Sequence, residues 1–186
     1  MANHILFLMA DGFEESEVVV PFDILLRGQV QVSLASISGK LLVSGAHGLN
    51  VVADMLLSEV DVSLFSGVFV PGGSRGVENL RESAAVLKLV QTFRDSGKWV
   101  AAICAGPTVL AAADILQDKE VTGYPSTEGE LQEKCKVYSK DRVVVDGKVV
   151  TSQGPGTAEE FGFRLLSLLE GNPRMEEVRR GMISRE

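Results

Sequence analysis

The sequence predicts a single α/β domain in which helices cover both faces of a mostly parallel sheet. The first observation is an alternation, along the whole chain, of short apolar runs with longer stretches of helical character. The second is that turn residues directly follow several of the apolar runs. The third is the size of the chain, since 186 residues of which 45% are hydrophobic can bury a sizeable core without disulfides or metals. No internal repeat or linker interrupts it, so residues 1–186 are expected to form one domain.

An apolar run and the acidic residues that follow it in the sequence predict the first strand and the first helix. Residues 5–9 are apolar and lead into Asp11-Gly12, as expected for a buried parallel strand that ends in a turn. Residues 14–26 predict a helix, and its start is acidic, where the helix dipole favours negative charge. Pro21 lies inside this range and should kink the helix or limit its first segment.

The next segment predicts strands separated by tight turns. Residues 30–37 alternate in polarity and predict a second strand. Within residues 39–57, turn signals at Gly39-Lys40 and at residues 45–48 predict short strand-like pieces on either side.

The remaining elements continue the alternation. Strands are expected at residues 68–70, 99–103, 143–145 and 149–151, and helices at residues 84–95, 107–113, about 158–169 and from 173 onward. Gly97 is expected to cap the first of these helices, and Asp146-Gly147 is a strong hairpin signal between the last two strands. Thr157 or a neighbour in the stretch 154–157 is expected at the N-cap of the helix that follows.

Three unusual loops follow predicted parallel strands. They cover residues 11–17, 71–76 and 104–107. Because ligands of open α/β sheets bind outside the carboxyl ends of the strands, these loops are expected to converge on one site.

Cys104 is the expected reactive centre of that site. It lies directly between a predicted strand and a predicted helix, and the small residues around it permit the sharp turn of a nucleophile elbow. The free N–H groups and the dipole of the following helix favour a thiolate there. The alternative is an ordinary buried cysteine, which packs like a small hydrophobic residue.

A nucleophile also needs donors for a developing oxyanion. The backbone N–H groups of Gly73 and Ala105 are the expected donors if the Pro-Gly-Gly loop lies beside Cys104. The alternative for Gly72-Gly73 is an ordinary turn. No glycine spacing matches a phosphate-binding loop or a dinucleotide fingerprint, so those two nucleotide-binding classes are not expected.

The nearest candidates for an acid or base are Glu14, Glu15 and Glu17 at the start of the first predicted helix. The alternative is that all three only interact with the helix dipole. A glutamate beside a thiolate would hold a proton, because two like charges would otherwise share one buried site, and the pair would titrate as a unit.

Composition excludes several other classes. The net charge of −7 disfavours direct nucleic-acid binding, and no apolar run approaches the roughly 20 residues that span a bilayer. The start of the chain lacks the basic region of a signal peptide, so a cytoplasmic protein is expected. The two cysteines are expected to be free thiols, with Cys135 exposed and incidental, and no Cys/His spacing indicates a metal site.

Four stretches of the sequence are similar to motifs of the ThiJ/PfpI superfamily. They are Asp11-Gly12-Phe13-Glu14-Glu15-Ser16-Glu17, Val70-Pro71-Gly72-Gly73, Ala101-Ala102-Ile103-Cys104-Ala105-Gly106-Pro107 and Thr151-Ser152-Gln153-Gly154-Pro155-Gly156-Thr157. Their order and spacing cover nearly the whole chain and most resemble the YajL branch, which also holds the Parkinsonism-associated protein deglycase. The resemblance implies a flavodoxin-like three-layer sandwich that forms a homodimer.

The resemblance also implies roles for individual residues. Cys104 matches the oxidisable nucleophile, Glu17 the protonated carboxylate that contacts it, and Gly73 and Ala105 the backbone donors. The other residues expected to line the site are Glu14, Arg27, Gly72, Tyr124 and Pro125, and those expected near the dimer interface are Arg27 and His47. His47 stands where a relative carries arginine.

Three departures from related groups bear on the expected activity. PfpI-type proteases have histidine directly after the cysteine, whereas Ala105 follows it here, so peptidase activity is disfavoured. Glutaminases of this fold need a downstream histidine, and no histidine follows position 47. Tyr124 stands where the Parkinsonism-associated relative has histidine, and the YajL type has an aromatic residue there too.

The expected function is therefore that of a cysteine-dependent, cofactor-independent deglycase or glyoxalase-like enzyme. Its substrates would be small aldehydes such as methylglyoxal and glyoxal, or their early adducts, with Cys104 as the nucleophile and Glu17 as the proton carrier. The alternatives are a redox-sensing, chaperone-like protein that uses oxidation of Cys104, and a small-molecule binding domain with a vestigial site.

Overall fold

The computed structural model describes residues 3–185, and its centre is a seven-stranded sheet. In spatial order the strands are β10 (Val143–Asp146), β11 (Val149–Ser152), β7 (Trp99–Ile103), β6 (Gly67–Val70), β1 (His4–Met9), β2 (Gln31–Ser36) and β5 (Met55–Leu56). All neighbouring pairs are parallel except β10 with β11. The predicted α/β class and the mostly parallel sheet are confirmed.

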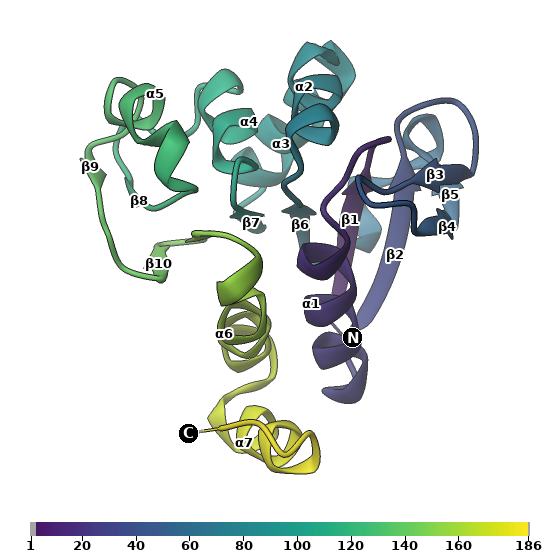
Figure 1. The fold of residues 1–186 in the computed structure, drawn as a ribbon, viewed down its shortest axis with the longest axis vertical. Coiled ribbons are helices and arrows are strands. Elements are labelled where there is room, and N and C mark those ends of the chain that lie inside the picture. The colour runs from purple at the N-terminus through teal and green to yellow at the C-terminus, as the bar shows by residue number, and fades with distance from the viewer. Residues whose placement is uncertain (1–2, 186) are drawn as a thin grey trace.

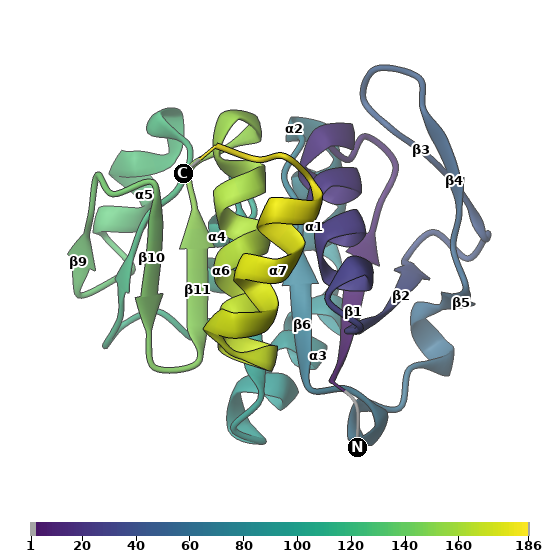
Figure 2. The same cartoon turned by 90° about the horizontal axis from the view of Figure 1, so that it is seen from below.

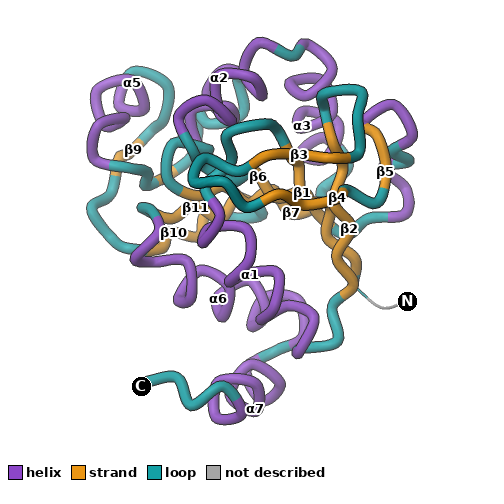
Figure 3. The backbone as a smooth tube through the Cα atoms, turned by 45° about the vertical axis from the view of Figure 1, so that its right-hand side comes forward, coloured by secondary structure: helices purple, strands orange, loops and turns teal. Residues whose placement is uncertain are grey.

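Helices form a layer on each face of this sheet, which gives the expected three-layer sandwich (Figures 1 and 2). One layer contains α1 (Glu15–Arg27) and α6 (Ala158–Glu170), with α7 (Asn172–Gly181) packed on α6. The other contains α2 (Ser74–Glu82), α3 (Ala84–Asp95) and α4 (Pro107–Ala112). Figure 3 shows the strands as one layer between these two groups of helices.

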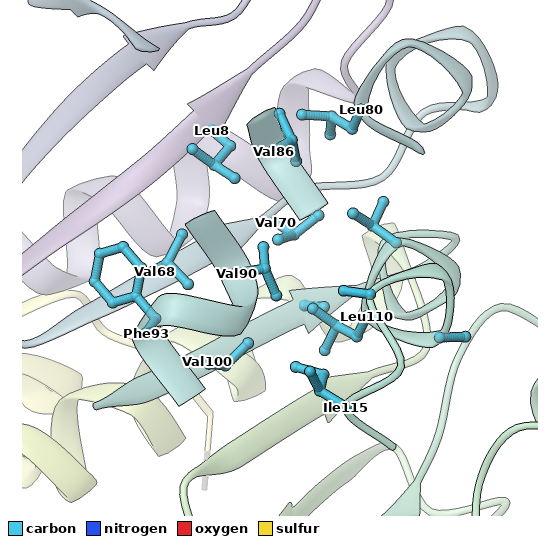
Figure 4. Close-up of a cluster of buried hydrophobic side chains, with 14 of the residues drawn as sticks. Leu8, Val68, Val70, Leu80, Val86, Val90, Phe93, Val100, Leu110 and Ile115 are labelled. Atoms are coloured by element: carbon cyan, nitrogen blue, oxygen red, sulfur yellow. The ribbon is translucent and has the colours of Figure 1, made fainter. Parts of the chain in front are cut away.

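The core has two halves because successive side chains of a strand point to opposite faces. On β1, Leu6 and Leu8 pack in a cluster with the α2–α4 layer, part of which Figure 4 shows. Phe7 points to the other face and stacks on Phe69 of β6, with ring centroids 4.1 Å apart. Each such buried side chain contributes about 1.5–3 kcal/mol to stability.

Smaller elements surround the sheet. β3 (Leu42–Ser44) and β4 (Asn50–Val52) form a separate hairpin, as the turn signals predicted, and β8 (Glu120–Val121) pairs with β9 (Val137–Tyr138) near α5 (Glu128–Gln132). Single 3₁₀ turns lie at Leu57–Glu59, Val62–Leu64, Pro125–Thr127 and Pro155–Thr157.

Three helices differ from the prediction, and one of them is the five-residue α5, which was not predicted. α2 was not predicted, because its sequence is mostly polar and contains Gly76, and only its buried Val77 and Leu80 show the apolar face. α1 continues through Pro21, so this residue does not limit the first segment. Gly162 of α6 lies against Pro21, and the absence of a side chain there leaves room for the proline in the packed helix pair.

Two side chains also differ from expectation. Thr157 occupies the N-cap position of α6, but its hydroxyl lies 2.6 Å from that of Ser152 and donates to the Gly154 carbonyl instead of accepting from a helix N–H. Cys135 is half-buried against the core rather than exposed, and burial raises its pKa.

None of the helices formed by residues 3–185 is both long enough and apolar enough to cross a membrane. The expectation about a signal peptide rests on the first residues of the chain. Two of these, Met1 and Ala2, lie outside the described residues.

Candidate active site

The three loops singled out in the sequence meet at the carboxyl edge of the sheet. β1 has β2 on one side and β6 on the other, so the crossovers diverge beside it and leave a crevice between the loops. The Glu14 N–H donates to the Gly72 carbonyl over 3.1 Å, which joins the loop after β1 to the loop after β6. Cys104 directly follows β7, the next strand. The predicted convergence is confirmed.

Cys104 lies at the sharp turn that its surroundings predicted. Its φ is 64°, a left-handed conformation that costs a non-glycine residue about 1–3 kcal/mol. Backbone hydrogen bonds hold it on both sides: its N–H donates to Ser152 over 2.9 Å, and its carbonyl accepts from the Tyr124 N–H over 2.8 Å. The strain is therefore maintained by β11 and by the loop that carries Tyr124.

Glu17 lies beneath the cysteine and is fully buried in the first turn of α1. Its Oε2 accepts the Gly72 N–H over 2.9 Å, whereas its Oε1 has no hydrogen-bonding nitrogen or oxygen partner in the described part of the chain. A Cβ on Gly72 would collide with this carboxyl group and lie 2.6 Å from the Cβ of Cys104. Only glycine at position 72 therefore allows the acid and the thiol to meet.

Two backbone N–H groups, those of Gly73 and Ala105, donate to the sulfur of Cys104. Gly73 has a φ of 95°, and a Cβ at this position would collide with the Gly12 carbonyl. A side chain is excluded there by conformation and by space, so this donor depends on glycine. The two N–H groups are placed where negative charge on the sulfur, or on an oxygen bonded to the reacting carbon, would be stabilised.

Burial controls the ionisation of the pair. It raises the pKa of Glu17 to about 7, and it raises the pKa of Cys104 to about 12, with the negative charge of Glu17 as the next cause. Ionised Glu17 disfavours ionisation of Cys104, whereas the hydrogen bond of Cys104 to Glu17 offsets part of the rise in the pKa of Glu17. The pair therefore loses one proton near neutrality and the second only in strong base. Desolvation therefore opposes the thiolate more strongly than the N–H groups alone favour it, so the ionisation of Cys104 has to be considered together with that of Glu17.

Hydrogen-bond donors decide where the single charge resides. The sulfur of Cys104 accepts two N–H groups, whereas the carboxyl of Glu17 accepts one and leaves Oε1 without a donor. An oxygen without a donor is best occupied by the proton itself, and the sulfur is the better place for the charge. The arrangement therefore favours a thiolate beside a protonated carboxyl group.

A cavity of about 710 Å³ opens above the sulfur. Its walls come from the loop after β1, the β3–β4 turn, the start of α2, the Cys104 turn and the segments around Tyr124 and Pro155. The hairpin wall is attached by two backbone hydrogen bonds, from Gly12 to Ser44 over 2.7 Å and from Ala46 to Phe13 over 2.9 Å.

The structure brings most of the expected site residues together. Those that line the cavity are Glu14, His47, Gly73, Cys104, Ala105 and Tyr124, and Gly72 and Glu17 lie directly beneath the sulfur. Two expectations about lining need correction. Arg27 lies at the opposite end of α1, where it pairs with Asp23 over 2.8 Å. Pro125 is exposed outside the cavity wall, which its neighbours Tyr124 and Ser126 form instead.

His47 joins the hairpin to the start of α1. Its Nδ1 lies 2.8 Å from Oε2 of Glu15, its backbone N–H donates to Oε1 of the same residue, and Glu14 lies 3.7 Å from the ring. The hydrogen bond to Glu15 raises the pKa of His47, and the charge of Glu14 is the next cause.

Among the described residues, Glu14, Glu15 and His47 also form a group that could hold a metal ion. Their side-chain atoms of the kind that bind metals lie within 4.8 Å of one another. The sequence did not predict this cluster. Because both Glu15 oxygens already accept hydrogen bonds from His47, it forms a hydrogen-bonded ion-pair network in the structure.

Ser44, Arg75 and Ser126 are among the wall residues that sequence reasoning did not single out. Arg75 could have been found, because it lies in the segment 71–76 that was expected to converge on the site. Ser44 could not, because only the docking of the hairpin places it at the site.

Comparisons with known proteins agree with this geometry. The family model described as the DJ-1/PfpI family matches residues 3–168. The chain is 34% identical to the Drosophila melanogaster protein dj-1beta over 183 residues, which cover 98% of each chain. It is 38% identical to the Caenorhabditis elegans glutathione-independent glyoxalase DJR-1.2 over 167 residues, which cover 90% of this chain and 88% of that one.

Solved structures agree as well. The crystal structure of Drosophila melanogaster DJ-1beta has a TM-score of 0.95 over the full length of both chains, at 34% identity. A structure of oxidized Toxoplasma gondii DJ-1 has a TM-score of 0.93, also over the full length of both chains, at 32% identity.

Proposed function

Because the chain belongs to the DJ-1/PfpI family, we propose that it is a cysteine-dependent glyoxalase-like enzyme or deglycase. Its substrates in this proposal are reactive dicarbonyls, such as methylglyoxal and glyoxal, or their early adducts with amines and thiols. The observation that carries the proposal is the buried pair of Cys104 and Glu17 at the floor of the cavity, with two N–H donors on the sulfur. A relative named as a glutathione-independent glyoxalase supports the same reaction class.

The first step is addition to the aldehyde. The thiolate of Cys104 forms a bond to the aldehyde carbon of methylglyoxal, and the C=O electron pair moves to the oxygen. The proton held by Glu17 neutralises that oxygen and produces a hemithioacetal. The N–H groups of Gly73 and Ala105 stabilise the charge that passes from sulfur to oxygen.

The second step moves hydrogen from the former aldehyde carbon to the neighbouring ketone carbon. Glu17, now ionised, removes the C–H proton to form an enediolate and returns this proton to the adjacent carbon. The hydroxyl proton of the hemithioacetal passes to the former ketone oxygen, which leaves a 2-hydroxy thioester on Cys104. Water then cleaves the thioester, so methylglyoxal and water give lactate, and glyoxal gives glycolate. For an adduct, the amine or thiol leaves when the sulfur displaces it. No cofactor takes part in this scheme.

The direct test is lactate production from methylglyoxal by the pure protein. Wild type should produce lactate, whereas Cys104→Ser and Glu17→Ala should lose essentially all of this activity. Cys135→Ser is the matched control, because this second thiol lies outside the cavity, and it should retain activity. Lactate formation that survives in Cys104→Ser would disprove the cysteine mechanism.

The same site supports a second candidate, a redox-sensing protein with chaperone-like activity. A sulfinate on Cys104 would accept the proton of Glu17 and the two N–H donors that already point to the sulfur. Peroxide should then add two oxygen atoms selectively at Cys104 and change the binding of unfolded client proteins. If Cys104 stays unmodified at peroxide doses that oxidise Cys135, this candidate fails.

We also propose that the protein forms a homodimer. Exposed apolar side chains occur on α1, where Val19 and Leu26 are 45% and 44% exposed, and on the β3–β4 hairpin, where Leu42 and Val52 are 56% and 68% exposed. Such surfaces are typical of an interface between subunits. Light scattering should give twice the mass of the chain, and a monomer at micromolar concentration would contradict this.

A further inference from the structure

Arg75 differs from the other charged side chains around the cavity. Asp11 accepts the Ser44 N–H over 2.8 Å, Glu14 accepts the Ser16 hydroxyl over 3.2 Å, and His47 is bound by a glutamate. Arg75 makes no ion pair and no side-chain hydrogen bond with any residue from 3 to 185. Its hydrogen-bonding capacity is therefore available to a bound molecule.

Arg75 lines the same cavity as the reactive Cys104. It is the second residue of α2 and follows Gly73, whose N–H donates to the sulfur of Cys104, by two positions. The base of its side chain packs against Gly12, where a Cβ would lie 2.7 Å from its own Cβ and 3.2 Å from its Cγ. The packed base limits where the guanidinium can go, although the residue is exposed.

Arg75 also borders a second cavity of about 350 Å³, to which Asp11, Asn79 and Glu82 contribute as well. Arg75 and Asp11 are shared by the walls of both cavities, so the two spaces adjoin at this arginine. Cavities of about 300–1,000 Å³ are usual for much larger ligands than a three-carbon dicarbonyl. There is thus room beside Cys104 for a substituent on the reacting carbonyl, with the guanidinium next to it.

We propose that Arg75 is a specificity-determining residue that binds the carboxylate of substrates in which a reactive carbonyl is joined to an anionic group. This inference rests on the proposed function and names its substrate class: carboxylate-bearing oxoaldehydes and adducts. The planar guanidinium binds a carboxylate through two parallel N–H···O bonds. It also offsets the negative charges of Glu14 and of the Cys104–Glu17 pair, which would otherwise repel an anionic substrate.

Alkylation of Cys104 tests this without requiring turnover. The rate of alkylation of Cys104 is measured in a Cys135→Ser background with iodoacetate, which carries a carboxylate, and with neutral iodoacetamide. The alkylation ratio is the first rate divided by the second. Arg75→Gln should lower this ratio about fivefold, the factor expected for an exposed ion pair. Arg75→Lys should restore part of it, and 1 M salt should remove most of the difference.

The matched control is Arg164→Gln. Arg164 is also exposed and has no ion pair among the described residues, but it lines a different cavity, next to Phe163 and Ser167. This variant should keep the wild-type ratio. An unchanged ratio in Arg75→Gln, or an equal fall in Arg164→Gln, would overturn the proposal.

Turnover gives the second readout. Lactate from methylglyoxal is compared with 2-hydroxyglutarate from 4,5-dioxopentanoate, an oxoaldehyde that carries a carboxylate. Arg75→Gln should lower the ratio of kcat/KM for the anionic over the neutral substrate by a similar factor, mainly through KM. If wild type converts neither substrate but the alkylation ratio still falls, the proposed function fails and the anion site remains. If methylglyoxal is converted and neither ratio changes, the anion site alone is wrong.

Discussion

Cys104 and Glu17 show how the environment of a residue sets its chemistry. Both are ordinary residue types whose pKa values are raised because the same burial removes water from both, and the negative charge of Glu17 raises the pKa of Cys104 further. The N–H donors around them then decide which of the two groups keeps the one proton that remains on the pair near neutrality. The properties of the site therefore belong to the pair.

The first prediction at this scale concerns Glu17→Gln. If the charge resides on the sulfur while Glu17 holds the proton, removing the acid leaves a buried thiol that must ionise alone. Alkylation of Cys104 by iodoacetamide at pH 7 should then slow by about tenfold, which corresponds to about one pKa unit. Faster alkylation in the variant would show instead that Glu17 is the ionised member in the wild type.

The second prediction concerns Gly72→Ala. The new Cβ would lie between the carboxyl of Glu17 and the side chain of Cys104, so one of them must move. Such overpacking costs about 1–3 kcal/mol of unfolding free energy, and lactate production should fall with it. Gly156→Ala is the control, because no atom lies within 4 Å of a Cβ at that position. Equal urea midpoints for the two variants would contradict this account of Gly72.

At the scale of elements, the β3–β4 hairpin contributes a wall of the site without belonging to the central sheet. It is attached to the loop after β1 and to the start of α1, the helix that carries Glu17. Both oxygens of Glu15 bind His47, one through its backbone N–H and one through its ring. The hairpin and the catalytic acid are therefore positioned by the same short segment.

Glu15→Ala should loosen this attachment. Loss of the hydrogen bonds to His47 should speed amide exchange of the hairpin, residues 42–52, by up to about tenfold. The effect should shrink as the pH rises through the pKa of His47, which is raised above 6.5, because the neutral ring binds Glu15 less strongly. Hydrogen–deuterium exchange measures it, with the exposed Asp118→Ala as control, and unchanged hairpin exchange would contradict the prediction.

At the scale of the whole molecule, the buried acid affects stability as well as chemistry. Folding raises the pKa of Glu17 from 4.5 to about 7, and the coupled pair loses its first proton near neutrality whichever of its two groups then carries the charge. Between these pH values the native state therefore binds more protons than the unfolded state. Stability from this group is therefore greatest at low pH, declines as the pH rises through that interval and levels off above it. The fold accepts this cost because the site requires the acid to be buried.

Urea unfolding from about pH 5 to pH 8 tests this consequence of linkage. The midpoint of wild type should fall more over this range than that of Glu17→Gln, which has no proton to lose. Parallel curves for the two proteins would show that Glu17 has an ordinary pKa in the folded state.

The sequence alone determined the class of fold and the position of the site in it. Apolar runs followed by turns specify buried parallel strands, and strands of that kind carry their loops to one edge, so the segments at Asp11, Pro71 and Cys104 had to meet. The sharp turn at Cys104 was also predictable, because its small neighbours and the following helix are local features.

The tertiary structure decided everything that depends on burial or on contact between distant segments. The residues alone left Glu14, Glu15 and Glu17 equal as candidates, and only packing shows that Glu17 is fully buried under the sulfur while Glu15 binds His47. The distance of Arg27 from the site, the hairpin wall and the free guanidinium of Arg75 have the same origin. Sequence periodicity records which face of an element is apolar, but the partners that face it, and the pKa values they impose, exist only once the layers have packed.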